Sequence, residues 1–199
     1  MNNTGILILA AGNSSRFGSA KQLVHYNNKT LIQHVIDEAV LAGANPVIVV
    51  TGARADEISK NIGTEEVQIV FNDHWQQGMA GSIVTGIKAA INYKMDKIII
   101  TVSDQPFVSS SLFKKLFQTQ EETGQPIVAC AYAGTVGTPV LFTQIYFDAL
   151  LSLEGEQGAK KILNANKQDI AIVDFPEGYI DIDTEADLKD LADKQNRIS

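Results

Sequence analysis

The sequence has 199 residues, 23 of them acidic and 16 basic, for a net charge of −7, and 45% are hydrophobic. This composition is typical of a globular protein, and the length suits one domain over residues 1–199 with its own core. No apolar run reaches the roughly 18 residues of a transmembrane helix, and no Lys/Arg cluster exceeds a pair. We therefore expect neither a membrane nor a nucleic-acid partner. The single cysteine, Cys130, precludes an intramolecular disulfide and makes the cytoplasm the default compartment.

Six apolar runs separated by helix-like segments predict alternating strands and helices. The runs cover residues 6–9, 46–50, 67–71, 97–102, 126–132 and 170–175. Several are continuously apolar, as in strands covered on both faces of a parallel sheet. The first lacks the basic flank of a signal peptide and is better interpreted as a strand.

Apolar pairs at four-residue spacing predict an amphipathic helix between the first two runs, capped by Thr30 and ended by Gly43. Further helices are expected at 80–93, 109–122, 143–153, 157–166 and 184–195. The alternation predicts an α/β fold: a single doubly wound, mainly parallel sheet with helices on both faces, like a Rossmann fold.

Open α/β sheets bind ligands at the carboxyl ends of their strands, so the segments that follow the strands are the candidate sites. After the first strand comes "LAAGNSSRFGSAK", residues 9–21. Gly12 and Gly18 allow a turn whose amides form an anion-binding nest, and Arg16 and Lys21 add positive charge. The spacing fits neither a P-loop nor a dinucleotide fingerprint. From the residues alone, a plain β–α turn is an equally good interpretation.

Six stretches in sequence order resemble the molybdenum cofactor cytidylyltransferase group of the MobA-like NTP transferases. They are "LAAGNSSRFGSAKQL", "NDHWQQGMAGSIVTGI", "SDQPFV", "GTPVLF", "LEGEQGAKKIL" and "DIDTEADL". The departures are Thr138 where histidine is frequent, Ser103 where glycine is common, and Glu156 and Lys160 in place of Asp and Arg. Each departure keeps its polarity class, so they bear on the acceptor more than on the chemistry.

The resemblance implies a site with four functions. Arg16 and Lys21 would be catalytic, and Asp104 and Asp183 would bind Mg²⁺. Lys160 and Lys161 would lie at the acceptor phosphate. The residues implied in nucleotide binding are Leu9, Ala10, Ala11, Gly12, Gly78, Met79 and Ser82.

Structural interpretations stay open for most of these residues. Asp104 before Pro106 also suits a turn, and the two lysines also suit a solvated helix face. Ser82 also suits a helix cap. In "YIDIDTEADL", Asp181 and Asp183 alternate with isoleucines and so share a face, but Asp183 or Thr184 also suits a cap.

Trp75 either covers a ligand or anchors its loop, and His34, beside the apolar stripe of the first helix, is interpreted as structural. The three histidines share no ligand spacing, which argues against zinc.

The implied activity is Mg²⁺-dependent transfer of CMP from CTP to the phosphate of a molybdopterin-type molybdenum cofactor, with release of pyrophosphate. Ala11 favours cytidine, because the guanylyltransferase branch resembles "LAGG" where this sequence has "LAAG". The alternatives are a guanylyltransferase, a sugar-phosphate nucleotidyltransferase, and a non-catalytic carrier of the cofactor. A molybdenum hydroxylase that receives the product is an implied partner.

Overall fold

The computed structural model describes residues 3–13, 20–26, 28–63, 67–182, 184 and 186–187. Its main sheet has seven strands in the order β5-β4-β1-β6-β8-β7-β9. Only β8 runs antiparallel to its neighbours in this sheet. The α/β fold with a mainly parallel sheet is therefore confirmed. The strands are β1 (Thr4–Ala10), β4 (Val47–Thr51), β5 (Val67–Phe71), β6 (Lys97–Val102), β7 (Ile127–Tyr132), β8 (Thr135–Thr143) and β9 (Ile170–Asp174); β2 (His25–Tyr26) and β3 (Lys29–Thr30) form a separate pair.

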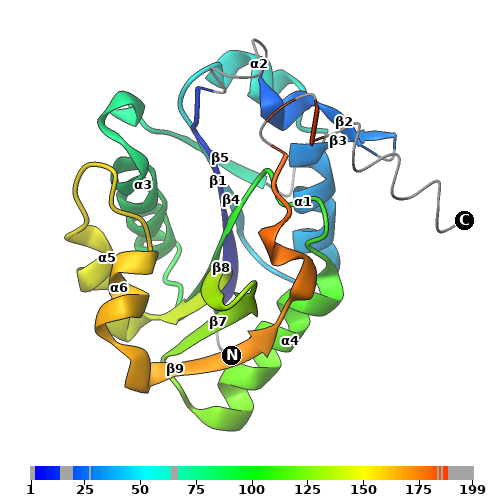
Figure 1. The fold of residues 1–199 in the computed structure, drawn as a ribbon. Coiled ribbons are helices and arrows are strands. Elements are labelled where there is room, and N and C mark those ends of the chain that lie inside the picture. Colours follow the sequence, from blue (N-terminus) through cyan, green and yellow to red (C-terminus); the bar gives the residue numbers. More distant parts are fainter. Residues whose placement is uncertain are drawn as a thin grey trace, which may run out of the picture.

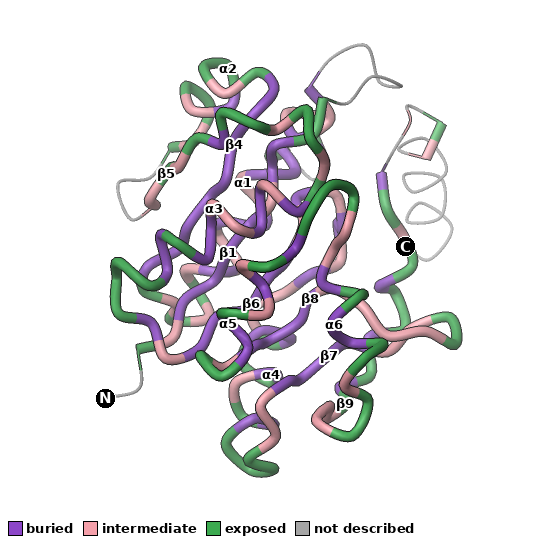
Figure 2. Tube along the Cα trace, turned by 90° about the vertical axis from the view of Figure 1, so that its left-hand side faces the viewer, coloured by how far each residue is buried: buried purple, intermediate pink, exposed green. Residues whose placement is uncertain are grey.

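Helices cover both faces of the sheet (Figure 1). On one side lie α1 (Leu31–Leu41) and α4 (Ser110–Thr123), and on the other lie α3 (Met79–Asn92), α5 (Phe147–Leu151) and α6 (Lys160–Ala165). Alternate residues of β1 supply the two cores: Ile6 and Ile8 pack on the α1 side and Leu7 on the α3 side. Figure 2 shows the central strands buried along their length. Burial of each such side chain contributes about 1.5–3 kcal/mol, which explains why the continuously apolar runs become central strands.

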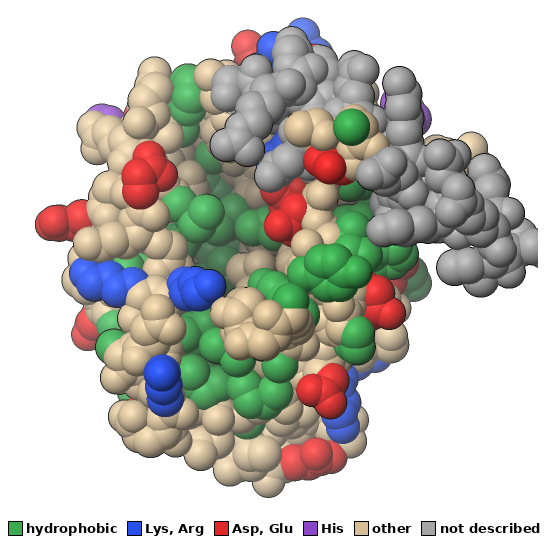
Figure 3. Space-filling view, viewed as in Figure 1, with side chains coloured by type: hydrophobic (Ala, Val, Ile, Leu, Met, Phe, Trp, Pro, Cys, Tyr) green, Lys and Arg blue, Asp and Glu red, His purple; other side chains and the backbone are tan. Residues whose placement is uncertain are grey.

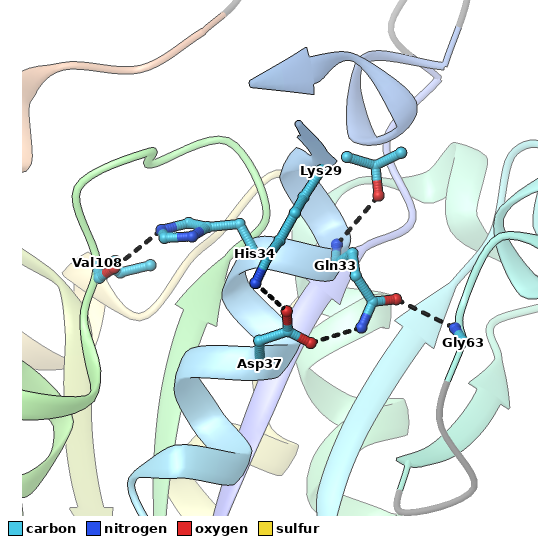
Figure 4. A network of polar contacts seen from close by, with 7 residues as sticks. Lys29, Gln33, His34, Asp37, Gly63 and Val108 are labelled. Carbon is cyan, nitrogen blue, oxygen red and sulfur yellow. Dashed lines mark hydrogen bonds and ion pairs between the residues drawn. The ribbon is translucent and has the colours of Figure 1, made fainter. Parts of the chain in front are cut away.

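The polar side of α1 is fastened to neighbouring segments (Figure 4). Thr30 is its N-cap, and the Thr30 hydroxyl accepts from the Gln33 amide, as expected. The His34 ring lies with Nε2 3.1 Å from the Val108 carbonyl, which supports its structural interpretation. Burial raises the pKa of Asp37, but hydrogen bonds from Lys29 and Gln33 outweigh it and bring the pKa below its usual value.

Two further hydrogen bonds join α1 to neighbouring elements. The Gln33 side chain also accepts from the amide of Gly63, which follows α2 (Ala55–Lys60). On the opposite side of the helix, the Glu38 carboxylate accepts from the amide of Ser110 at the start of α4. These contacts join α1 to the segment after α2 and to the start of α4.

The strand β8 is absent from the sequence-based prediction. It forms a hairpin with β7 through Ala133 and Gly134, both at positive φ (47° and 74°), as the tight turns of hairpins require. An alanine at positive φ is an unusual turn residue, and Pro139 inside the strand argues against a regular ladder. The register shift after Ala129 accommodates that proline.

Three predicted helices differ from the observed ones. The segment predicted at 143–153 is a 3-10 turn, η3 (Gln144–Tyr146), followed by α5, and the segment predicted at 157–166 shortens to α6. Of the helix predicted at 184–195, only Thr184 and residues 186–187 are described. The remaining 3-10 turns are η1 (Lys21–Leu23), η2 (Trp75–Gln77), η4 (Lys167–Asp169) and η5 (Pro176–Tyr179).

The strand order places a crevice beside β1. From β1 the chain proceeds outward to β4 and β5, then returns through α3 to β6 on the other side of β1. The segments after β1 and β6 therefore diverge at this point, where open α/β sheets bind their ligands. In the part of the chain that the structure describes, no helix is long and apolar enough to cross a bilayer.

Candidate active site

A pocket of about 390 Å³ lies at this crevice, between the segments that follow β1, β5 and β6. Its size falls within the ~300–1,000 Å³ range of small-molecule sites. On the face seen in Figure 3 a hollow has hydrophobic side chains inside it, with acidic and basic side chains around it. The pocket is lined by Leu9, Ala11, Gly12, Asn13, Lys21, Gln22, Trp75, Gln76, Gly78, Met79, Ser82, Val102, Ser103, Asp104 and Glu156.

Lys21 and Asp104 meet across the pocket. The Lys21 Nζ lies 2.5 Å from the Asp104 Oδ2, and the two side chains are 17% and 19% exposed. Lys21 begins η1, and Asp104 follows β6, so the sheet brings together residues 83 positions apart. This ion pair joins the predicted phosphate-binding lysine to the predicted metal-binding carboxylate.

The loop after β1 is held by Gln22, a residue that the sequence-based prediction missed. The Gln22 side chain is buried, and its amide donates to the carbonyls of Ala10 and Gly12 at 3.3 and 3.1 Å. Ala11 and Gly12 line the pocket, whereas the Ala10 side chain packs in the core on the α1 side.

The start of α3 forms the second wall. The helix begins at Met79 with Gly78 as its cap, so the interpretation of Ser82 as the N-cap is wrong. Ser82 lies one turn inside the helix, where its hydroxyl accepts from the Asn72 side chain at 3.1 Å. Asn72 in turn accepts from the His74 amide, which fixes the loop that carries Trp75. Trp75 lines the pocket, and its Cβ lies 2.5 Å from where a Cβ on Gly52 would be, which supports its interpretation as a loop anchor.

The loop before α6 packs on the start of α3 and forms a third wall of the pocket. Gly78 has φ 108°, and a Cβ placed there would lie 2.3 Å from the Gly155 carbonyl oxygen. The Ala80 amide donates to that same oxygen at 3.1 Å. This contact brings Glu156 to the pocket, as a second carboxylate that the sequence-based prediction did not assign to it.

A smaller, more apolar pocket of about 230 Å³ adjoins the first and shares Leu9, Met79 and Val102 with it. Lys160 and Thr138 line this second pocket. Lys161 lines neither of the two pockets, and its ammonium donates to the side chain of Gln157.

Tyr132 also lines the second pocket. Burial raises the pKa of Tyr132 above its usual value. A hydrogen bond with the Thr138 side chain opposes this shift, and the negative charge of Asp181 adds to it. Asp181 therefore lies near enough to affect this wall of the site.

Two predicted site residues, Arg16 and Asp183, lie outside the described residues, as does Gly18. Thr184 and Asp187 form a reciprocal cap: the Thr184 amide donates to the Asp187 carboxylate, and the Asp187 amide donates to the Thr184 hydroxyl. Capping thus accounts for Thr184, one of the alternatives predicted for this segment.

The pocket residues fit a divalent cation that arrives with a nucleotide. Among the described lining residues, Lys21 supplies one positive charge and Asp104 and Glu156 two negative charges. A triphosphate needs further positive charge to bind there, and Mg²⁺ typically binds through one or two carboxylates plus substrate phosphates. Within the described part of the chain, no three His, Cys, Asp or Glu residues cluster as a metal site. The chemistry therefore suits a metal shared with a ligand rather than an all-protein cage.

Sequence comparison identifies the family. The model of the MobA-like NTP transferase domain matches residues 6–170. The Escherichia coli molybdenum cofactor cytidylyltransferase is 23% identical over 92% of both chains, and the Vibrio parahaemolyticus molybdenum cofactor guanylyltransferase is 29% identical over 93% of both. The Paenarthrobacter nicotinovorans nicotine blue oxidoreductase is 32% identical, over 57% of this chain and 54% of its own length.

Solved structures show the same fold. Rv0371c from Mycobacterium tuberculosis superposes with a TM-score of 0.84 at 25% identity, covering 96% of this chain and 98% of its own. A second structure of Rv0371c, in complex with manganese, has a TM-score of 0.76 at 23% identity, over 96% and 98% of the two chains. A nucleotidyl transferase from Methanothermobacter thermautotroptrophicus has a TM-score of 0.82 at 23% identity and covers both chains fully. Because the family model covers residues 6–170, this chain belongs to the MobA-like NTP transferase domain family and is a nucleotidyltransferase.

Proposed function

We propose that this protein transfers CMP from CTP to the phosphate of a molybdopterin-type molybdenum cofactor and releases pyrophosphate. The observation that carries the proposal is the meeting of Lys21 and Asp104, 2.5 Å apart, beside Ala11 and Gly12 in the pocket at the crevice. This arrangement places a cation, a carboxylate and a glycine turn together, as nucleotidyl transfer requires.

In the proposed reaction, an oxygen of the acceptor phosphate attacks the α-phosphorus of CTP. The bond from that phosphorus to the bridging oxygen of the β-phosphate breaks, and pyrophosphate leaves with the electron pair. The attacking oxygen is already ionised near neutral pH, so the residues need only align two polyanions and neutralise charge. Lys21 and Arg16 bind the triphosphate and stabilise the charge that develops on the leaving group.

Asp104 would hold Mg²⁺, with Asp183 as the second carboxylate. The metal would supply positive charge that offsets the charge of the phosphates. The manganese complex of the Rv0371c structure supports a divalent metal in this fold. The choice of Asp183 over Asp181 rests on the family resemblance.

Cytidine selection is assigned to Ala11, which lines the pocket and is 6% exposed. A Cβ on Gly52 would lie 2.9 Å from the Ala11 Cβ, so the methyl group is closely packed from behind. The proposal is that this residue limits the space for a base. This favours the smaller pyrimidine, in line with the "LAAG" sequence; the relatives include both a cytidylyltransferase and a guanylyltransferase.

Leu9, Gly78, Met79 and Ser82 are proposed to bind the nucleotide, and Lys160 the acceptor phosphate, because each lines one of the two adjoining pockets. Ala10 would contribute through its backbone, whose carbonyl accepts a hydrogen bond from Gln22. Lys161 is a weaker candidate because its ammonium donates to the Gln157 side chain. A molybdenum hydroxylase is the proposed recipient of the product.

The test is pyrophosphate release by the purified protein with Mg²⁺ and each of CTP, GTP, UTP and ATP, with and without molybdenum cofactor. Release that needs both CTP and the cofactor is the expected result. A strong preference for GTP contradicts the cytidine assignment. Cofactor binding without any pyrophosphate release would show a carrier, and release with sugar phosphates alone would show a sugar-nucleotide enzyme.

A further inference from the structure

Gln105, which follows the proposed metal-binding Asp104, is a buried junction between three segments of the site. Its side chain is 2% exposed. The amide nitrogen donates to the Gly178 carbonyl at 2.7 Å and to the Thr138 carbonyl at 3.3 Å. One side chain at the end of β6 thus contacts both β8 and the turn η5 that follows β9.

The segment that follows η5 is also held near Asp104. The Ile182 amide donates to the Asp104 carbonyl at 3.0 Å, and the Ile182 side chain is fully buried. Residues 178–182 are therefore tied at both ends to residues 104–105. Asp181 lies within this tied segment and acts electrostatically on Tyr132, which lines the second pocket.

Close packing around Tyr132 limits the movement of η5 and β8. A Cβ on Gly178 would lie 2.4 Å from the Tyr132 ring, and one on Gly137 would lie 2.2 Å from the Tyr132 hydroxyl oxygen. Tyr132 is thus confined between the turn η5 and β8, the two segments to which Gln105 donates. A shift of either segment would move the wall of the second pocket relative to Asp104.

The Gln105 side chain leaves one buried polar atom unsatisfied. Within the described residues, the buried Oε1 of Gln105 has no hydrogen-bond partner, which is unfavourable for a buried polar atom. A second glutamine has the same features away from the site: Gln120 of α4 is 9% exposed, donates to the Gln125 carbonyl, and has an unpartnered Oε1. Gln120 lies near the amino end of β7, away from the carboxyl ends of the strands, and so provides a matched control.

We infer that Gln105 is a positioning residue that fixes the acceptor side of the site, formed by Thr138, Tyr132 and residues 178–182, with respect to Asp104. The inference rests on the proposed nucleotidyl transfer for its catalytic consequence. The side chain touches neither pocket, so it acts through the segments that it holds. Its loss should misplace the acceptor while the nucleotide pocket, with Lys21 and Asp104, keeps its residues.

The experiment compares Gln105→Met with Gln120→Met in the full chain by amide hydrogen exchange and by steady-state kinetics. In Gln105→Met we expect the amides of residues 179–182 to exchange at least about tenfold faster, because local opening sets the exchange rate. We expect kcat/KM for the acceptor to fall about tenfold or more, since small misplacements of a reactant are costly, and KM for CTP to change less than about threefold. Gln120→Met should leave these amides and both kinetic constants within about twofold of wild type.

Unchanged protection of residues 179–182 in Gln105→Met would overturn the inference, and so would an equal loss of transfer in Gln120→Met. If Gln105→Met does not fold, Gln105→Glu keeps the side-chain length, removes the donor, and is read in the same way. A wild-type protein that releases no pyrophosphate with any substrate pair contradicts the proposed function, whereas the exchange result decides the positioning by itself.

Discussion

At the scale of single residues, the Lys21–Asp104 pair has two competing uses. In this structure, the lysine neutralises the carboxylate that we assign to the metal. A cation that binds Asp104 must therefore displace the Lys21 ammonium from it. Bound phosphates would ease this displacement, because they offer the ammonium another negative partner. Because the pair is mostly shielded from solvent, the interaction is stronger than that of an exposed ion pair, which contributes about 1 kcal/mol or less.

Lys21→Met is accordingly expected to abolish pyrophosphate release and yet to strengthen the binding of Mn²⁺ without nucleotide by about tenfold, as removal of a nearby like charge requires. Titration of Mn²⁺ followed by electron paramagnetic resonance measures the second effect. Lys29→Met is the control, since Lys29 pairs with Asp37 on α1 outside the pocket. Retained turnover would refute the role of Lys21, and unchanged Mn²⁺ affinity would refute the competition.

Ala11→Gly removes the side chain of a residue that lines the proposed nucleotide pocket. We expect the ratio of kcat/KM for GTP to that for CTP to rise about five- to tenfold, because a methyl-sized difference in a pocket contributes about 1 kcal/mol or more to discrimination. The ratio is measured with both nucleotides in competition. A ratio that stays within twofold of wild type would remove Ala11 from the basis of specificity.

At the scale of elements, the site depends on how loops dock on one another. The start of α3 and the loop before α6 meet through Gly78 and Gly155, without side chains between them. Such an approach requires glycine at position 78, where φ is 108° and a Cβ would collide with backbone. This docking delivers Glu156 to one pocket and Lys160 to the other.

Gly78→Ala is expected to lower the free energy of unfolding by about 3 kcal/mol or more, through backbone strain and the collision with Gly155. It should also raise KM for the nucleotide, because the loop must move away from α3. Gly124→Ala is the matched control: Gly124 also has positive φ (69°), but no atom lies within 4 Å of its added Cβ. That variant should lose only about 1–2 kcal/mol, the cost of the left-handed backbone. Urea denaturation measures both, and equal losses would contradict the docking argument.

At the scale of the whole molecule, burial of Cys130 in the core makes the free energy of unfolding depend on pH. Cys130 on β7 is fully buried, and burial raises its pKa from 9.0 to about 12. The folded state therefore keeps the thiol proton at pH values where the unfolded chain has lost it. The stabilisation is complete below pH 9 and is lost as the pH rises from about 9 towards about 12.

We expect the free energy of unfolding to fall by up to about 1.4 kcal/mol per pH unit within that window on account of Cys130 alone. Cys130→Ala should be less stable than wild type at pH 8, because it leaves a small cavity, and should lose stability less steeply above pH 9. Urea denaturation between pH 8 and 11 checks the two slopes. Parallel curves for the two proteins would show that the thiol does not contribute.

Local sequence determined the strands and the amphipathic helix. The apolar runs of β1, β4 and β6 are buried on both faces, and Thr30 caps α1, because these properties depend on neighbours in sequence. The hairpin of β7 and β8 was not predictable, since Ala133 and Pro139 do not match the usual residues of a turn and a strand. The position of Ser82 inside α3 also depended on Gly78, whose conformation is set by contact with Gly155.

The sequence by itself determined the fold class, because apolar runs leave a local signature, and the resemblance of its six stretches to one family pointed to Lys21, Asp104, Ala11 and Gly12. Only the tertiary structure decided which of them meet. Three contacts join segments far apart in the chain. They are the 2.5 Å contact of Lys21 with Asp104, the position of Glu156 at the pocket beside α3, and the hydrogen bonds from Gln105 to Thr138 and Gly178. Such contacts follow from the order of strands around β1 and from close packing of the loops, neither of which is encoded in a local pattern.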